Sequence, residues 1–258
     1  LRLRAMAPLA PALGQSDFGT LVHRLLEDGV RALQLWPDTA AATAYLLQQG
    51  AAALAAYRDV PALYATWSAQ WAQIADWFAE TERERWRAGW QPAALEVKAE
   101  MLLSVAGRTH TLVGRVDRID SGVGGYAVID YKTGTVPSDK QVQSGLAPQL
   151  PLLGMMLEAG VFAGLKPRPI SALLYCKLGG RIGGQASVAL KDSTDLVVAA
   201  RRALEATVAA YADPTMPYLV VPQPQFVPRF DDYQHLGRIN EWGLAQAAED
   251  GAEDDDAG

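Results

Sequence analysis

The spacing of apolar residues changes once along the chain, near Gln91 and Pro92, from a helical period to a strand period. From Ser16 to about Gly89 the apolar residues recur at helical spacing, as in SDFGTLVHRLLEDGVRAL. Beyond Pro92, the segments ALEVKAEMLLSV, HTLVGRVDRID and YAVIDYKTG are typical of strands joined by glycine-containing turns. Residues 148–160 and DLVVAARRALEATVAAYA return to helical spacing, and ISALLYCKL is a further strand. This order predicts a helical N-terminal part packed on a sheet.

The absence of an internal repeat or a Gly/Ser linker from the sequence favours one domain. Half of the residues are hydrophobic, which is enough for a substantial core. We predict an N-terminal extension of a fragment over 1–15 and a single domain over 16–245, mainly helical over 16–90, with a sheet core and flanking helices over 91–245. Residues 246–258 are expected to form an acidic disordered tail. Since the chain starts without Met or a long apolar segment, we interpret it as a piece of a longer protein.

The net charge of −6 comes from the C-terminal tail, because the last ten residues, EDGAEDDDAG, hold six acids. The rest of the chain is close to neutral, so a nucleic-acid partner would have to bind a local patch. A single cysteine, Cys176, cannot by itself hold an iron–sulfur cluster or form an internal disulfide. This predicts a cytoplasmic protein without such a cluster. No apolar run approaches the roughly 20 residues that span a bilayer, so no membrane partner is expected.

Four large apolar residues fall on one face of the third helical segment: Trp67, Trp71, Ile74 and Phe78. A Trp-rich stripe can stack on nucleic-acid bases, but helical spacing is more typical of a helix that packs into a core. We therefore predict core packing.

Charged residues interrupt the apolar strand VIDYKTG at 128–134. Because side chains alternate along a strand, Asp130 and Lys132 share one face while Tyr131 points the other way. The turn SGVGG joins this strand to the preceding one as a hairpin. A hairpin centred in that turn places Asp117 opposite Asp130, with Cβ atoms roughly 4.5–5.5 Å apart. Two like charges there destabilise the sheet unless a cation lies between them.

Mg²⁺ suits such a site because it prefers a few carboxylate oxygens plus waters. Lys132 would then orient or deprotonate a water, or stabilise the charge on a phosphate under attack. Two simpler alternatives stay open. Lys132 neutralises both acids in a half-buried ion triad, or the register slips by one residue and puts Asp117 on the opposite face.

Three motifs, GRVDRID (114–120), VIDYKTG and PQLPLL (148–153), resemble in this order those of the RecB-like nuclease domain of the PD-(D/E)XK superfamily. The closing segment DDYQHLGRINEW resembles the C-terminus of AddB, the partner subunit of the AddAB helicase–nuclease, in its alphaproteobacterial form. The similarity covers roughly residues 23–242. It implies an α/β fold with a restriction-endonuclease-like core, in which helices flank a mixed central β-sheet.

The resemblance assigns a role to each residue that matches a motif. Asp117 and Asp130 match the metal-binding acids, and with Lys132 they form the catalytic set. Tyr131 would lend its backbone carbonyl to the metal, and Gln149 would touch DNA beside the active site.

Two more residues are metal-ligand candidates through the same resemblance. His23 matches a histidine on an upstream helix, although without the family it reads as a surface partner of Glu27 four residues on. Glu96 is a further candidate, either as the acid before the core strands or as part of the exposed face of an alternating strand.

The implied activity is that of a Mg²⁺-dependent DNA exonuclease, with Mn²⁺ able to substitute, within an AddAB-type helicase–nuclease that repairs and recombines double-strand breaks. Its partners would be linear DNA ends, the single-stranded product of unwinding and an AddA-type subunit. Two departures stand out: Leu153 occupies the place of the family's tyrosine four residues after Gln149, and the four cluster cysteines of some AddB proteins are absent. Leu153 favours an alternative, a catalytically degenerate domain that binds DNA or a partner. A free-standing nuclease related to the CRISPR-associated Cas group is disfavoured by the AddB-like C-terminus.

Overall fold

The computed structural model describes residues 14–32, 36–179 and 184–218. Residues 13–209 form one compact unit, and the chain from Ala210 onward belongs to a second unit, of which 210–218 are described. The predicted acidic tail, the segment DDYQHLGRINEW and nearly all of the predicted N-terminal extension lie outside the described residues. The single domain over 16–245 therefore stays a prediction.

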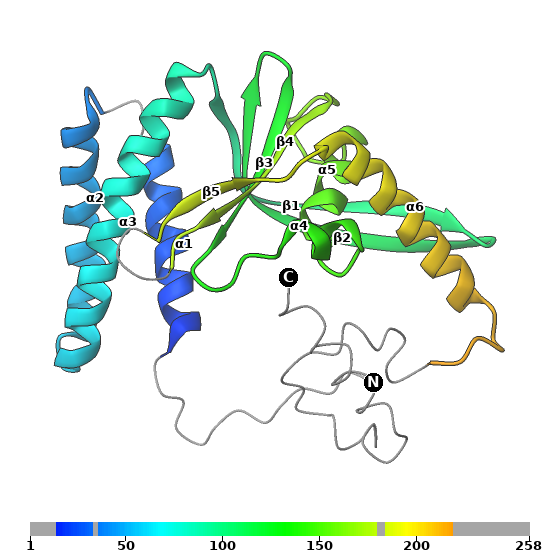
Figure 1. Cartoon of the computed structure of the whole chain (residues 1–258), viewed down its shortest axis with the longest axis horizontal. Coiled ribbons are helices and arrows are strands. Elements are labelled where there is room, and N and C mark those ends of the chain that lie inside the picture. Colours follow the sequence, from blue (N-terminus) through cyan, green and yellow to red (C-terminus); the bar gives the residue numbers. More distant parts are fainter. Residues whose placement is uncertain (1–13, 33–35, 180–183, 219–258) are drawn as a thin grey trace, which may run out of the picture. The chain divides into compact units, whose positions relative to one another are not determined.

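The N-terminal part is helical, as predicted. Helix α1 (Gln15–Arg31) is followed by α2 (Thr39–Leu54), the short 3₁₀ helix η2 (Ala55–Tyr57) and the long α3 (Pro61–Arg87). Figure 1 shows α1, α2 and α3 packed beside one another on one side of the sheet.

The Trp-rich stripe of α3 lies in the core, which confirms the prediction from its spacing. Trp67 and Trp71 are 3% and 2% exposed. The indole nitrogen of Trp71 donates to Leu46 O on α2 at 2.9 Å, so the one polar group of this buried ring is satisfied. Gly50 of α2 permits the close approach, because a Cβ atom at that position would overlap the Trp71 ring.

Five strands form one mixed sheet in sequence order: β1 (Gln91–Val105), β2 (Arg108–Gly122), β3 (Gly125–Lys132), β4 (Ile170–Lys177) and β5 (Ala186–Ala189). Strands β1, β2 and β3 are antiparallel neighbours, β4 runs parallel to β3, and β5 runs antiparallel to β4. The connection from β3 to β4 carries α4 (Asp139–Gln143) and α5 (Gln149–Glu158), because parallel neighbours require a long crossover. Helix α6 (Ser193–Ala212) follows β5. The predicted mixed sheet with flanking helices is confirmed.

Each face of the sheet carries its own hydrophobic cluster. One cluster joins α1, α2 and α3 with Ile129 and Tyr131, and the other joins α5 and α6 with Val128. Figure 1 shows the two sets of helices on either side of the sheet. Strand β3 is therefore buried on both faces, which explains its nearly continuous apolar sequence. The alternation places Asp130 on the α5 face with Val128, near the C-terminal end of the strand.

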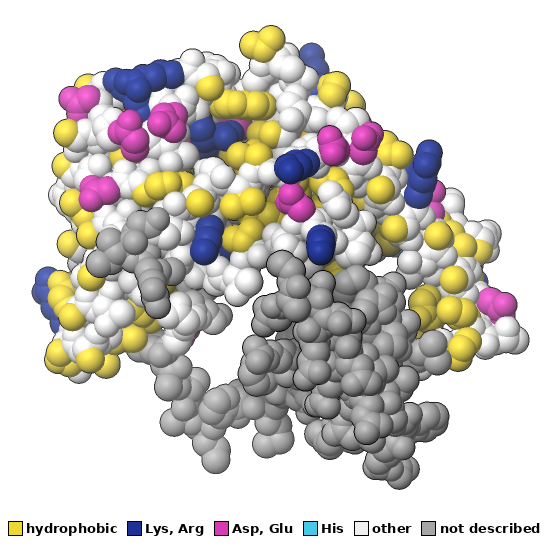
Figure 2. Space-filling model, in the orientation of Figure 1, with side chains coloured by type: hydrophobic (Ala, Val, Ile, Leu, Met, Phe, Trp, Pro, Cys, Tyr) yellow, Lys and Arg dark blue, Asp and Glu magenta, His cyan; other side chains and the backbone are white. Residues whose placement is uncertain are grey.

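The surface offers no broad region of one charge on the face shown in Figure 2, where the described Lys and Arg side chains lie among acidic and hydrophobic ones. Of the helices described, none is both long enough and apolar enough to cross a membrane.

Candidate active site

A cleft of about 730 Å³ lies between α1 and the sheet. Helix α1, strands β1, β2 and β3, and the first residue of α5 all contribute side chains to its walls. All the site residues predicted from the sequence line this one cleft: His23, Glu96, Asp117, Asp130, Tyr131, Lys132 and Gln149.

The hairpin between β2 and β3 has the register expected from its turn. Arg118 pairs with Ile129, which puts Asp117 opposite Asp130 one step further along the strands. At that step the backbone N–H of Tyr131 donates to the side chain of Asp117 (Oδ2, 2.9 Å) and not to the backbone of β2. The slipped register, which the sequence left open, is wrong.

A break in strand alternation brings Glu96 and Asp117 into the cleft. Val116 and Ile119 pack in the same cluster although they lie three residues apart, so β2 changes faces once between them. On β1 the matching point is Glu96, whose φ of +51° is left-handed and costs a non-glycine residue about 1–2 kcal/mol. The ladder between β1 and β2 skips the pair of Glu96 and Asp117. Glu96 is therefore half-buried in the cleft and not part of a regular exposed face.

His23 reaches the strands from α1. Its Nε2 lies 2.8 Å from Tyr131 O, and its Nδ1 lies 3.5 Å from Asp117 Oδ2. A bond to a carbonyl requires the proton on Nε2, so in the neutral ring the Nδ1 lone pair faces Asp117. Glu27, the surface partner considered for His23, pairs with Arg31 instead. The interpretation of His23 as half of a surface pair is therefore wrong.

Three potential metal ligands converge at this point. One ligand atom from each of His23, Glu96 and Asp117 lies within 4.8 Å of the other two. Burial raises the pKa of Asp117 to about 6, and Asp130 and Glu96 add to the shift, although His23 and the Tyr131 N–H oppose it. Burial is the main cause of this raised pKa, and a cation beside Asp117 would offset the cost of ionising the buried carboxyl, while Glu96 also pairs with Arg115. A metal-binding histidine commonly donates its second ring N–H to a backbone carbonyl, as His23 does to Tyr131.

Asp130 adds a buried oxygen that lacks a hydrogen bond. The residue is 3% exposed, and its Oδ1 accepts from Gln149 Nε2 at 2.8 Å. Its Oδ2 lies 2.7 Å from Lys132 Nζ as an ion pair, but no donor in the described part of the chain meets hydrogen-bond geometry at this oxygen. Lys132 offsets the charge of this buried oxygen, and the oxygen keeps a lone pair with which it can bind a cation. Carboxylates with one imidazole are ligands that suit Mg²⁺ or Mn²⁺.

Gln149 links the acid and the base of β3. Its Oε1 accepts from Lys132 Nζ at 3.3 Å while its Nε2 donates to Asp130. Asp117 faces His23 instead of Lys132, so the half-buried triad of Lys132 with both acids is not formed. The contact of Gln149 with DNA stays a prediction. Its amide also has a second role, because the oxygen binds Lys132 while the nitrogen binds Asp130, which orients Lys132 beside the acid.

A buried ion network, which the sequence reading did not identify, supports the site from the side of the sheet that α3 covers. Arg118 is 1% exposed and donates to both Glu82 and Asp120, and Arg85 donates to Asp120 as well. Arg118 Nη1 also donates to Tyr131 Oη at 3.2 Å. The ring of Tyr131 is thus anchored, and its backbone atoms contact two of the metal-ligand candidates. The signal was available in GRVDRID, where Arg118 and Asp120 flank the apolar Ile119 and lie beyond the predicted metal ligand Asp117.

Leu153, which stands where the family has a tyrosine, does not face the cleft. Leu153 is buried in the cluster under α5, where a Cβ atom at Gly114 would lie 2.7 Å from its Cδ2. A different tyrosine lies beside the site: Tyr175 of β4 pairs in register with Asp130, and its ring centroid is 6.0 Å from Lys132 Nζ. Burial raises the pKa of Tyr175 to about 12, with a contribution from Asp130, so its hydroxyl stays protonated near neutral pH.

Carboxylates and an imidazole that converge on one point, with a lysine held beside them, form the class of site that binds a divalent cation for hydrolysis. The sequence model of the PD-(D/E)XK nuclease superfamily matches residues 1–223, and the chain belongs to this superfamily. The restriction-endonuclease-like core expected from the motifs is confirmed by this match and by the mixed five-stranded sheet. Membership implies a nuclease, and nucleases of this superfamily typically use Mg²⁺ or Mn²⁺.

The similar curated proteins come from Rickettsia and are named only as uncharacterized proteins. A protein of Rickettsia bellii is 31% identical over 162 residues, which cover 61% of this chain and 19% of the relative. One of Rickettsia typhi is 30% identical over 152 residues, which cover 55% of this chain and 17% of the relative. The chain thus matches less than a fifth of the length of these relatives. The crystal structure of SSO0001 aligns with 72% of this chain and 86% of its own at 14% identity, and the TM-score of 0.27 is too low to carry an argument.

Proposed function

We propose that this chain is the nuclease domain of an AddB-type subunit, a Mg²⁺-dependent DNA exonuclease within an AddAB-type helicase–nuclease. It would act in the cytoplasm in double-strand break repair and recombination. The order of the motifs and the segment DDYQHLGRINEW support the AddB assignment. The observation that carries the activity is the contact of Lys132 and Gln149 with Asp130, beside the ligand atoms of His23, Glu96 and Asp117.

In this proposal His23, Glu96, Asp117 and Asp130 hold the cation, with the second lone pair of the Tyr131 carbonyl available to it. The cation supplies Lewis-acid stabilisation of the charge on the phosphate. Both aspartates must be ionised to bind it, which Asp117 achieves above its pKa of about 6.

Lys132 serves the reaction from the edge of the cation site. Water attacks phosphorus and loses a proton, the bond to the leaving oxygen breaks, and the leaving oxygen takes up a proton from solvent. The ammonium group of Lys132 stabilises the charge that develops on the phosphate, and Gln149 holds that group in place. In its neutral form the same amine would accept the proton of the attacking water.

Cleavage of end-labelled linear DNA with Mg²⁺ tests the proposal. Asp130→Ala and Lys132→Ala should each lower the rate by about 10²–10³-fold or more, since the first removes a ligand of the cation and the second removes a cationic group beside the reacting phosphate. Lys166→Ala, an exposed change before β4, is the control and should cleave like the wild type. Undiminished cleavage by both site variants contradicts the assignment, and the same gel reveals strand polarity.

Leu153 favours one further candidate, a degenerate domain that binds DNA or an AddA-type partner without cutting. Calorimetry separates the two functions. Heat of Mg²⁺ or Mn²⁺ binding at millimolar concentrations, lost in Asp130→Ala, supports the nuclease. A wild-type protein with no such heat and no cleavage supports the degenerate domain.

A further inference from the structure

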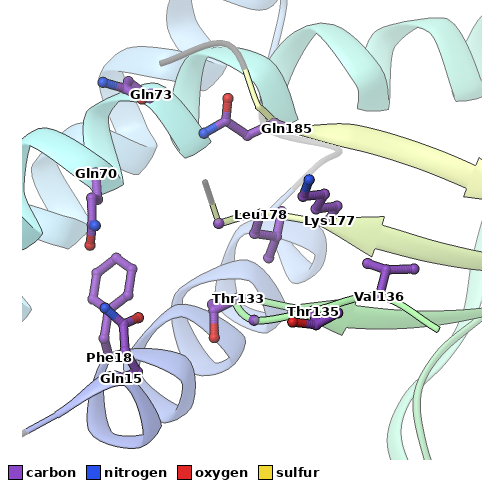
Figure 3. A pocket seen from close by; sticks show the side chains of 12 residues that line it. Gln15, Phe18, Gln70, Gln73, Thr133, Thr135, Val136, Lys177, Leu178 and Gln185 are labelled. Atoms are coloured by element: carbon purple, nitrogen blue, oxygen red, sulfur yellow. The ribbon is translucent and has the colours of Figure 1, made fainter. Parts of the chain in front are cut away.

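A second groove, of about 590 Å³, adjoins the catalytic cleft. The two share Gln15, Thr133 and Gly134 as lining residues, so they form one continuous depression. In Figure 3 the second groove is bounded by α1, by Gln70 and Gln73 of α3, and by the ends of β3 and β4. The buried ring of Phe18 forms part of its wall.

The lining of this groove differs chemically from that of the catalytic cleft. Among the described residues that form it, none is acidic, whereas the cleft next to it contains four carboxylates. Four glutamines, two threonines and one lysine supply its polar groups. In a chain with a net charge of −6, a neutral to positive groove beside the active site can accept a polyanion without repulsion.

Two side chains of the groove lack partners within the described structure. Gln70 Oε1 is buried and accepts no hydrogen bond, which is costly for an amide oxygen, so rotation of the side chain into the groove, where a ligand can donate to it, is favoured. Lys177 pairs in register with Lys132 on the neighbouring strand, and no described acid forms an ion pair with it. Two adjacent lysines favour an anion near them. The groove therefore offers an acceptor for N–H groups and a cation for negative charge.

We propose that the second groove binds the nucleotides of a single DNA strand next to the phosphate that is cleaved, with Gln70 contacting a base edge and Lys177 a backbone phosphate. An unpaired strand fits because its base edges are free to bond with side chains, whereas those of a duplex are paired. Exocyclic amino groups of bases would donate to Gln70 Oε1 once the amide turns from its buried position into the groove. This inference rests on the proposed nuclease function, since the groove continues its cleft.

Binding of fluorescent single-stranded oligonucleotides, with Ca²⁺ in place of Mg²⁺, tests the groove without cleavage. Gln70→Met keeps the side-chain length and removes the unpaired oxygen, and Lys177→Glu reverses the charge. Each should weaken binding of oligonucleotides of about 16 nucleotides roughly 10-fold and leave binding of those of about 4 nucleotides less affected. Gln48→Met, exposed on α2, and Lys166→Glu are the matched controls and should bind like the wild type.

Thermal melting distinguishes loss of binding from loss of the fold. Gln70→Met should melt at or above the wild-type temperature, because it removes a buried oxygen without a partner. Unchanged affinity of both groove variants, or a wild type that binds no oligonucleotide, overturns the inference. A wild type that binds through the groove but never cleaves with Mg²⁺ contradicts the nuclease proposal alone, so the two failures are distinguishable.

Discussion

Two clusters of charged side chains lie on the same strands, and they differ in burial and in how their aspartates are paired. In the buried network, the cations Arg85 and Arg118 match the acids Glu82 and Asp120. Glu82, Arg118 and Asp120 are each at most 3% exposed. The cleft is more open: Arg115 pairs with Glu96 and Lys132 pairs with Asp130, whereas Asp117 faces no lysine or arginine among the described ion pairs and has only His23 beside it.

Asp117 and Asp120 show how the two clusters differ in the pairing of an aspartate. They are three residues apart on β2, yet Asp120 accepts from two arginines while Asp117 has a raised pKa. A buried charge with its partners in place contributes to a specific fold, whereas one without them is held at a cost and marks a functional site.

Removing the central cation of the buried network should have the largest effect on stability. Arg118→Leu leaves Glu82 and Asp120 buried without their main partner, so the free energy of unfolding should fall by about 3–5 kcal/mol in urea denaturation. Arg31→Leu breaks an exposed pair with Glu27 and should cost less than about 1 kcal/mol. Equal stability of the two variants would contradict the structural role of the network.

The same substitution at Asp117 and Asp120 should change stability in opposite directions. The pKa of Asp117 is raised on folding from 3.8 to about 6, so its contribution is present below pH 3.8 and lost as pH rises through 6. In metal-free protein at pH 8, Asp117→Asn should therefore raise the free energy of unfolding by about 1–3 kcal/mol.

Asp120→Asn removes the acid from two arginines and should lower the free energy of unfolding by about 3 kcal/mol. Denaturation of both variants in the presence of a chelator measures the difference. Destabilisation by both substitutions would show that Asp117 is compensated in the same way as Asp120.

The affinity for a divalent cation should depend on pH through Asp117. Below about pH 6 the cation competes with a proton, so calorimetric affinity for Mn²⁺ should fall towards tenfold per pH unit. Asp117→Asn should bind Mn²⁺ more weakly and lose this pH dependence around 6. The same slope in the variant and the wild type would assign the titration to another ligand.

The smallest effect is expected at the strained residue of β1. Glu96→Gly and Glu96→Ala both remove the carboxylate, but only glycine adopts φ of +51° without strain. The glycine variant should be more stable than the alanine variant by about 1 kcal/mol in urea denaturation, and both should bind Mn²⁺ more weakly. A more stable alanine variant would argue against strain at this position.

Local patterns predicted much of the fold and the central part of the site. The change of period at Pro92 separated helices from strands, and the spacing of Trp67, Trp71, Ile74 and Phe78 correctly predicted a buried helix face. The turn after β2 set the register that brings Asp117 opposite Asp130, because the geometry of a short hairpin depends on few residues.

Contacts between distant segments were harder to predict from residue patterns. The placement of His23 beside Asp117 required the family resemblance, since nothing local to α1 distinguishes it from a surface histidine. Glu96 enters the cleft through a left-handed residue that no propensity favours. Leu153 replaces the tyrosine that the family uses near DNA, and the structure places it in the core. A different tyrosine, Tyr175, lies beside Lys132.

The sequence by itself determined the order of the elements, the hairpin and the acid and base on one face of β3, because these follow from short-range periodicity and turn geometry. Only the tertiary structure decided which carboxylates have partners. Asp117 and Asp120 are the same residue type on one strand, and their charges behave differently because α3 brings arginine to one and α1 brings a histidine to the other. Burial and long-range contacts set the electrostatics of this site, and neither is a property of a local sequence pattern.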